Sequence, residues 1–256
     1  IPIILLALGY GLIGAIDDWF TIRPRNGKRG IGSKPKFLLQ LVLAIAFVAW
    51  MVKTKHLSSV VSFEDIIKLD LGWVYPVFAV LFITGMANFI NITDGLDGLA
   101  AGLVVILAGS LFLITNPNSF SIFPGVLLAL CGACLAFLWF NFNPAKVFMG
   151  DTGSLFIGAL IPAIAIAAKM ELFVIIAGMV FILDGLSSAL QWAVFKYTRI
   201  KTGTGKRIFK MSPVHHHFEL CGIPEQQVVV RCWIIGAIFG VLALLLIIVS
   251  QLNAKL

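Results

Sequence analysis

The chain is built from long apolar runs, and the length of these runs limits what it can fold into. A helix that crosses the roughly 30 Å hydrocarbon core of a bilayer needs about 20 residues with few charges among them. Eight runs approach this length: Ile1–Ile16, Phe37–Val52, Trp73–Ile92, Leu99–Thr115, Ile122–Asn141, Leu155–Ala168, Leu172–Trp192 and Val228–Gln251. Because 60% of the residues are hydrophobic and only 12% are charged, a soluble core cannot bury them all. The sequence therefore predicts an all-α, polytopic membrane bundle.

The chain begins inside the first apolar run, at Ile1 rather than at a methionine, and no charged leader precedes it. We therefore expect residues 1–256 to form a single transmembrane domain that is truncated at its N-terminus. Earlier spans would then precede the first run.

Positive charge gathers in two connections between the apolar runs. Of the 19 Lys and Arg residues, six lie in residues 19–36 and six in residues 196–210. They are Arg23, Arg25, Lys28, Arg29, Lys34 and Lys36 in the first, and Lys196, Arg199, Lys201, Lys206, Arg207 and Lys210 in the second. The positive-inside rule makes both connections cytoplasmic, and alternating crossings then define the cytoplasmic loops. These loops are 17–36, 93–98, 142–154 and 193–227. The net charge of +7 thus reflects topology and attraction to anionic headgroups or phosphates, and it requires no nucleic-acid partner.

Four polar motifs fall in these predicted cytoplasmic loops. Asp17 and Asp18 end the first apolar run, while the other three motifs are "NFINITDGLDGLA" (88–100), "NFNPAKVFMGDTGS" (141–154) and "KMSPVHHHFEL" (210–220). Ionisable groups are costly at membrane depth, and several of them on one side of a bundle usually line a polar site. We therefore expect the four motifs to form one site at the cytoplasmic face.

The residue types in these motifs suit phosphate and a divalent cation. Aspartates supply the hard oxygen ligands that Mg²⁺ prefers, and the candidates are Asp17, Asp18, Asp94, Asp97 and Asp151. The glycines of "TDGLDG" and "MGDTGS" precede predicted helices, whose N-termini favour anions. Basic loop residues add cations that bind phosphate. A site open to both cytosol and lipid favours transfer of a phosphoryl-linked group between a soluble nucleotide and a lipid.

Each motif also has a purely structural interpretation when it is taken alone. The paired aspartates could cap a helix at the interface, "TDGLDG" could be a tight turn, and Asp151 with Thr152 and Ser154 could be an N-cap. The three adjacent histidines could order a basic loop. Asp184, in the seventh run, could line the site or mark a broken helix. The coincidence of four motifs on one side favours the functional interpretation.

Four segments carry a resemblance to a known family. They are "GAIDDWF", "NFINITDGLDGLAAG", "NPAKVFMGDTGSL" and "TGKRIFKMSPVHHHFELCGIPEQQVVVRCWII". Together they resemble the phospho-N-acetylmuramoyl-pentapeptide transferases of bacterial peptidoglycan synthesis, across nearly the whole chain. That family belongs to the polyprenyl-phosphate N-acetylhexosamine-1-phosphate transferase superfamily, and the histidine segment separates it from its siblings.

The resemblance implies a reaction, a cofactor and a setting. The family transfers phospho-MurNAc-pentapeptide from UDP-MurNAc-pentapeptide to undecaprenyl phosphate, a membrane lipid, and forms lipid I and UMP with Mg²⁺. Its members are homodimers of ten-helix subunits in the bacterial inner membrane, with both ends in the periplasm and the active site at the cytoplasmic face. The eight spans predicted here fit that topology if the first two are absent.

The aspartates match the family's motifs position by position. Asp151 matches the magnesium ligand of the "GDTGS" motif. Asp17 and Asp18 match the paired catalytic aspartates, of which the first is the favoured base toward the lipid phosphate. Asp94 and Asp97 match the second aspartate motif, which the resemblance associates with catalysis, the nucleotide and the metal.

The resemblance also implies substrate-binding positions. Asn88 and Asn91 belong to the second aspartate motif, and Phe148 matches a phenylalanine by the uracil pocket. Lys36, in its "KFLLQ" setting, matches a lysine of the active-site groove. The histidine motif lies over the substrate phosphates or sugar and is required for activity; it comprises His215, His216 and His217.

Two positions depart from the family pattern, and two rival functions stay open. Thr21 stands where a lysine is common, and Asp184 lies in a stretch where a glutamate is expected. A sibling transferase that uses UDP-GlcNAc would share the aspartate motifs but carry a different histidine motif. A transporter would place polar residues at several membrane depths rather than at one face. Direct attack by the lipid phosphate is favoured over a covalent aspartyl intermediate.

Overall fold

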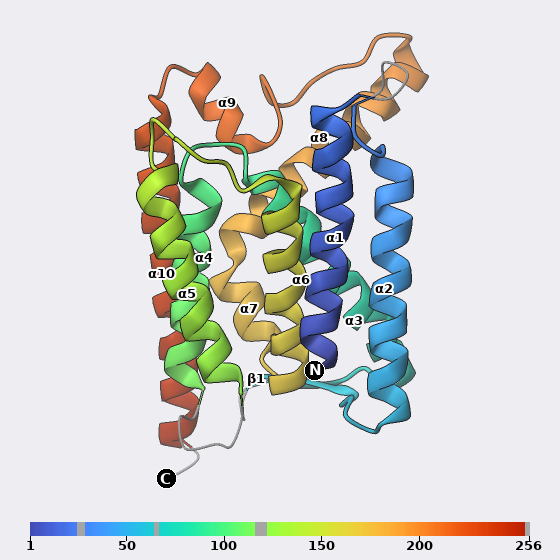
Figure 1. Cartoon of the computed structure of the whole chain (residues 1–256), viewed down its shortest axis with the longest axis vertical. Coiled ribbons are helices and arrows are strands. Elements are labelled where there is room, and N and C mark those ends of the chain that lie inside the picture. The colour runs from blue at the N-terminus through green and yellow to red at the C-terminus, as the bar shows by residue number, and fades with distance from the viewer. Residues whose placement is uncertain (25–28, 64–66, 116–121, 254–256) are drawn as a thin grey trace.

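The computed structural model describes residues 1–24, 29–63, 67–115 and 122–253, and over these ranges the chain forms a bundle of helices (Figure 1). The helices are α1 Pro2–Ile22, α2 Ser33–Lys53, α3 Tyr75–Thr93, α4 Leu99–Ile114, α5 Phe123–Asn141, α6 Gly150–Ala168, α7 Glu171–Ala177, α8 Met179–Thr202, α9 Val214–Leu220 and α10 Glu225–Asn253. Two of the predicted cytoplasmic cations, Arg25 and Lys28, lie outside the described residues.

The predicted all-α membrane fold is confirmed. In the described part of the chain, seven helices are long and apolar enough to cross a membrane, and α4 is a shorter apolar helix. Each of the eight predicted apolar runs coincides with one of these helices or, for the seventh run, with two. The length of the apolar runs was therefore sufficient to locate the spans.

The helix ends differ from the ends of the apolar runs. α1 continues through both aspartates to Ile22, and α2 begins at Ser33, so that Lys36 lies in its first turn. α6 begins at Gly150 and thus includes Asp151. These polar residues continue the helices because their side chains form contacts with neighbouring helices. The apolar pattern of the sequence does not predict such contacts.

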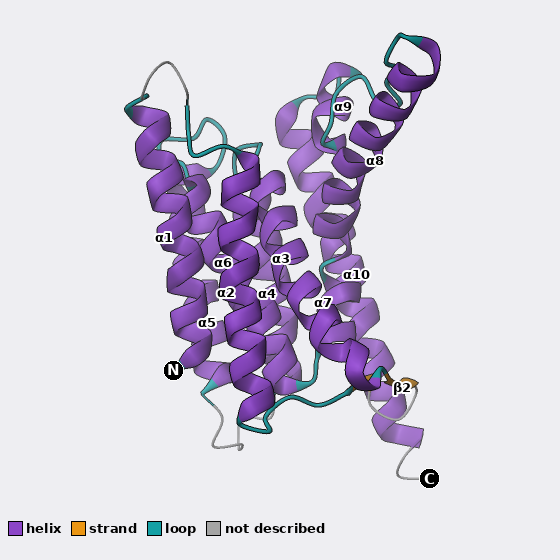
Figure 2. Ribbon diagram, turned by 90° about the vertical axis from the view of Figure 1, so that its right-hand side faces the viewer, coloured by secondary structure: helices purple, strands orange, loops and turns teal. Residues whose placement is uncertain are grey.

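The predicted seventh span is two helices rather than one. α7 ends at Ala177 and α8 begins at Met179, with Gly178 between them at φ −89° and ψ 13°. A Cβ atom at Gly178 would lie 2.6 Å from the carbonyl oxygen of Val174, so glycine fits the break. Beyond the break α8 leans away from the rest of the bundle (Figure 2).

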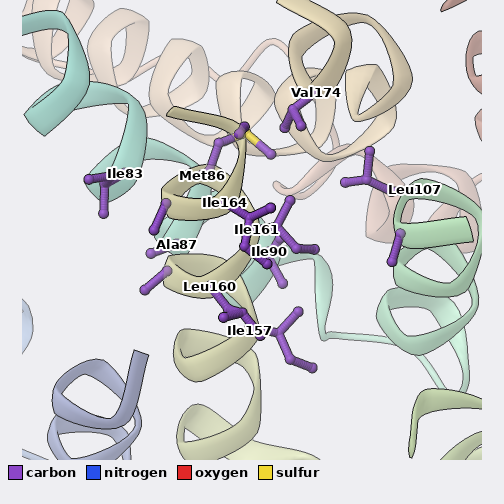
Figure 3. Packing of buried hydrophobic residues seen from close by; sticks show 14 of the residues in the cluster. Ile83, Met86, Ala87, Ile90, Leu107, Ile157, Leu160, Ile161, Ile164 and Val174 are labelled. Carbon is purple, nitrogen blue, oxygen red and sulfur yellow. The ribbon is translucent and has the colours of Figure 1, made fainter. Parts of the chain in front are cut away.

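α6 forms the centre of the bundle and is the most buried of the candidate spans among the described residues. Its apolar side chains pack against those of α3, as Figure 3 shows for Ile157, Leu160 and Ile161 around Ile90. A Cβ atom at Gly158 would lie 2.6 Å from the Cα atom of Ala87, so the two backbones approach closely. A helix that is apolar on all sides is typical of such a central position.

The connections contain a β-hairpin, a 3₁₀ turn and a short helix, which the apolar pattern did not predict. β1 Val60–Phe63 pairs antiparallel with β2 Ile67–Asp70, and a short 3₁₀ turn, Gly72–Val74, leads into α3. The third is α9, which lies at the opposite end of the bundle from the hairpin (Figure 1). The start of α1 lies at the hairpin end.

Candidate active site

The site is set up by the crossing of α1 and α6. A Cβ atom at Gly14 would lie 2.2 Å from the carbonyl oxygen of Asp151, so the two helices touch backbone to backbone. The next turn of α1 carries Asp17 and Asp18, which therefore lie beside the first turn of α6. Gly14 thus permits the close approach that brings Asp17 and Asp18 beside Asp151.

Asp18 caps α6 from outside that helix. Its carboxylate accepts hydrogen bonds from the backbone N–H of Asp151 at 3.1 Å, from the backbone N–H of Thr152 at 2.9 Å and from the Thr152 hydroxyl at 2.6 Å. The first N–H groups of a helix have no partner within it and favour negative charge. Gly150, at φ +64°, lets the chain turn so tightly that a Cβ atom there would lie 2.7 Å from Asp18 Oδ2.

Asp151 lies between a cation and an amide. The Lys36 ammonium donates to Asp151 Oδ2 at 2.5 Å and lies 3.6 Å from Asp17 Oδ2. The Asn91 amide donates to Asp151 Oδ1 at 2.8 Å and to the Ser154 hydroxyl at 2.9 Å. Helices α1, α2, α3 and α6 therefore each contribute a polar side chain to this cluster.

Asp94 adds a further carboxyl group beside the cluster. It directly follows α3 as its C-cap. Burial, and then the charges of Asp151 and Asp18, raise the pKa of Asp94 from the ordinary value of 3.8 to about 7. Burial and the neighbouring carboxylates therefore oppose ionisation of Asp94.

The structure places Asp97 in a separate network. Its carboxylate accepts hydrogen bonds from the Asn143 amide at 3.1 Å and from the backbone N–H of Ala145 at 2.9 Å. Its backbone N–H donates to Glu225 at 2.8 Å, and the Asn143 amide donates to the same glutamate at 3.1 Å. The network ties the turn after α3, the loop before α6 and the start of α10 together.

Two of the three predicted histidines, His215 and His216, lie over the turn after α3. A Cβ atom at Gly95 would lie 2.6 Å from His215 Nε2 and 3.2 Å from His216 Nε2. His216 Nδ1 lies 2.6 Å from the carboxylate of Glu219 in the same helix. His217 lies elsewhere, because its Nδ1 accepts the backbone N–H of Lys210 at 3.1 Å. Two of the three imidazoles thus face the aspartate turn, and the third holds a loop.

Two predicted substrate-binding residues do not join the carboxylate cluster. Asn88 donates to the side chain of Gln40 and to the Thr84 carbonyl, each at 2.7 Å, and so links α3 to α2. Phe148 lies in the loop before α6 with 78% of its surface exposed, so its ring is free to contact a ligand. Their predicted roles stay predictions.

The described residues offer few protein ligands at any one point for a metal ion. In the described ranges no three His, Cys, Asp or Glu side chains lie close enough to chelate a metal together. The Lys36 ammonium nevertheless lies against carboxylate oxygens of Asp17 and Asp151, where a positive charge is stabilised. Mg²⁺ commonly takes one or two protein carboxylates and completes its shell with water and substrate phosphates. The cluster therefore suits a magnesium ion that arrives with a phosphorylated substrate.

Residues that organise the site were missed at the sequence level. Glu225 and Asn143 support the turn that carries Asp97, and Asn141 joins the same turn to the Val147 carbonyl. Glu225 opens an apolar run, where an acidic residue is typical of an ordinary helix start. The only available signal was the presence of two asparagines inside the recognised "NFNPAKVF" segment.

The chain is similar to known proteins along nearly its whole length. Residues 1–169 match the family model described as glycosyl transferase family 4. A protein of Oleidesulfovibrio alaskensis named phospho-N-acetylmuramoyl-pentapeptide-transferase is 40% identical, over 94% of this chain and 71% of that protein. Proteins of the same name from Shouchella clausii and Bacillus thuringiensis are 42% and 43% identical, over 94% of this chain and 72% of each relative. Since this identity extends along nearly the whole chain, the chain belongs to the phospho-N-acetylmuramoyl-pentapeptide transferases, within glycosyl transferase family 4.

Proposed function

We propose that this chain transfers phospho-MurNAc-pentapeptide from UDP-MurNAc-pentapeptide to undecaprenyl phosphate, giving lipid I and UMP. The observation that carries the proposal is the meeting of Asp17, Asp151 and Lys36, from three helices, at one end of a membrane bundle. A site of that kind can receive a soluble nucleotide and a lipid phosphate together. The names of the relatives support the same reaction.

The main barrier to this reaction is charge repulsion, because an anionic lipid phosphate must approach an anionic diphosphate. Lys36 places a positive charge among the carboxylates, and this charge stabilises negative oxygens that enter beside it. The Asn91 amide holds Asp151 in one orientation. The chain thus offers positions prepared for charge, and we favour direct attack by the lipid phosphate over a covalent aspartyl intermediate.

The paired aspartates divide their tasks. Asp18 uses its oxygens to cap α6, whereas Asp17 accepts the backbone N–H of Ile31 at 2.7 Å and faces Lys36. Asp17 is therefore the better placed of the two to act as a base toward an incoming phosphate. A phosphate monoester is already largely ionised near neutral pH, so such a base has a modest task.

Magnesium is part of the proposal. Asp151 would hold it, and the phosphates of the nucleotide would supply further oxygen ligands. When bound, the ion would neutralise charge on the diphosphate and stabilise UMP as a leaving group.

The setting is also proposed. The described cations Lys196, Arg199 and Lys201 lie on the C-terminal part of α8, at the same end of the bundle as α9 (Figure 1). This group of positive charges at the end that carries α9 supports a cytoplasmic site in the bacterial inner membrane. The homodimer rests on the family resemblance alone.

The test is UMP release by the purified protein in detergent, with UDP-MurNAc-pentapeptide and a polyprenyl phosphate. We expect UMP release to require both substrates and Mg²⁺. Asp151→Asn should abolish the release, and the control Asp70→Asn, on the distant hairpin, should not change it. No release from folded wild-type protein would overturn the proposal. Equal release with UDP-GlcNAc in place of the MurNAc substrate would favour the sibling transferase instead.

A further inference from the structure

His215 is the most enclosed of the three histidines, with 1% of its side chain exposed. Its Nδ1 lies 2.7 Å from Oδ2 of Asp184, and its backbone N–H donates to Oδ1 of the same residue at 3.3 Å. Asp184 is itself buried, in the second turn of α8. Both residues line an apolar cavity of about 840 Å³ between α8 and α10. A carboxylate in such surroundings needs a partner, and His215 is that partner.

The other ring nitrogen of His215 has no such partner. Nε2 is buried and makes no hydrogen bond within the described residues. It faces Gly95, where an added Cβ atom would lie 2.6 Å away, and His216 Nε2 faces the same glycine. A buried nitrogen without a hydrogen bond is destabilising. Nε2 therefore lies against the Asp94–Gly95 turn with an unused capacity to bind a polar group.

The contact with Asp184 determines which nitrogen is presented to that turn. A carboxylate accepts a hydrogen bond, so Nδ1 must carry the proton when it faces Asp184 Oδ2. The neutral imidazole then has a lone pair at Nε2, directed toward Gly95. Without the Asp184 carboxylate, His215 could adopt either tautomer, and its ring could take another orientation.

We propose that Asp184 is a positioning residue that fixes the tautomer and orientation of His215, so that Nε2 is presented to substrate at the Asp94–Gly95 turn. Asp184 acts through His215 and does not touch substrate. This inference rests on the proposed function, because it assigns His215 to substrate contact. It also gives a role to Asp184, which lies in one of the two places where the chain departs from the family pattern.

A simpler role would be that Asp184 only fastens α9 to α8. The neighbouring Ser187 provides the control, because its hydroxyl accepts the backbone N–H of Val214 at 2.9 Å and donates to the Asp184 carbonyl, not to an imidazole. Ser187→Ala therefore weakens the same attachment of α9 but leaves the partner of Nδ1 in place. Asp184→Asn keeps the size of the side chain, and its amide can donate to Nδ1 and so permit the opposite tautomer.

The experiment is ¹⁵N NMR of the histidine rings in the detergent-solubilised protein. The chain has only four histidines, so single His→Gln variants assign each signal. We expect His215 to be protonated at Nδ1 and bare at Nε2 in the wild type and in Ser187→Ala. Asp184→Asn should shift the proton to Nε2 or mix the two forms, and Asp184→Glu should restore the wild-type pattern.

UMP release supplies the second readout. Asp184→Asn should lower kcat by about 10–100-fold, as loss of an orienting partner does, and should change KM for the nucleotide much less. Ser187→Ala should lower kcat less than Asp184→Asn does. An unchanged tautomer in Asp184→Asn, or an equal loss of kcat in Ser187→Ala, would overturn the inference. Absence of UMP release in the wild type would overturn the proposed function, while the ring signals would still decide whether Asp184 sets the tautomer.

Discussion

The Lys36 ammonium lies 2.5 Å from a carboxylate oxygen of Asp151, although 115 positions separate the two residues in the sequence. This contact joins the first turn of α2 to the first turn of α6. Asp17, on α1, lies 3.6 Å from the same ammonium. Three helix ends are thus held around one positive charge.

Removing that charge should impair catalysis more than folding. Lys36→Met keeps most of the length of the side chain but leaves the carboxylates without their cation, so we expect UMP release to fall by about 10²-fold or more. Lys34→Met is the matched control, because Lys34 is exposed one half-turn earlier in the same helix. A near wild-type rate in Lys36→Met would contradict the role given to Lys36.

Asp94 should make stability depend on pH. Its pKa is about 7 in the folded protein against an ordinary 3.8, so the folded state binds the proton more tightly than the unfolded state. The resulting stabilisation is complete below the ordinary value and is lost as the pH rises through about 7. In EDTA, the thermal midpoint of the wild type should therefore decrease as the pH is raised from about 5 to about 8. The expected decrease is about 2 °C or more for each kcal/mol of unfolding free energy that is lost.

Asp94→Asn should flatten this part of the profile, because an amide does not titrate. Asp70→Asn is the control, since hydrogen bonding lowers the pKa of the exposed Asp70 carboxyl and keeps it ionised throughout the range. The same slope in Asp94→Asn and in the wild type would assign the pH dependence to another group.

The glycine at the crossing of α1 and α6 should be irreplaceable. Gly14→Ala would force apart two backbones that leave no room for a methyl group, so we expect a lower thermal midpoint and slower UMP release. Gly132→Ala, in α5, is the matched control, because nothing lies within 4 Å of its added Cβ atom. An exposed Gly→Ala change inside a helix is usually stabilising by roughly 0.5–1 kcal/mol. Equal midpoints for the two variants would show that the crossing tolerates a side chain.

Cys221 offers a test of the membrane orientation. It is exposed directly after α9, whereas Cys131 and Cys134 are buried and Cys232 is partly buried. A membrane-impermeant maleimide should label the protein in inverted inner-membrane vesicles and not in right-side-out spheroplasts, and Cys221→Ser should abolish the labelling. Labelling of Cys221 in spheroplasts would place the site at the periplasmic face.

The spans were predictable because burial in hydrocarbon depends on composition over about 20 residues. The break at Gly178 was not, because the sequence is equally apolar on both sides of it and the break is determined by packing. The last turn of α1 was also missed. In the sequence two aspartates end an apolar run, whereas in the fold Asp18 is stabilised by N–H groups of α6.

The site was predictable as a set of motifs and not as a set of contacts. The four motifs lie at one end of the bundle, as their spacing between spans predicted (Figure 1). The division between Asp94, near Asp151, and Asp97, near Glu225, depends on which side of a turn each residue faces. The partner of His215 lies 31 positions away in another helix, beyond the reach of any local pattern.

α9 has seven residues, and isolated helices of that length are not stable in water. It persists because Asp184 and Ser187 hold its first turn, and both of these residues lie on α8. Beyond Gly178, α8 leans away from the rest of the bundle (Figure 2). The direction in which α8 runs from Gly178 therefore sets where α9 lies, and with it the position of His215 relative to Gly95.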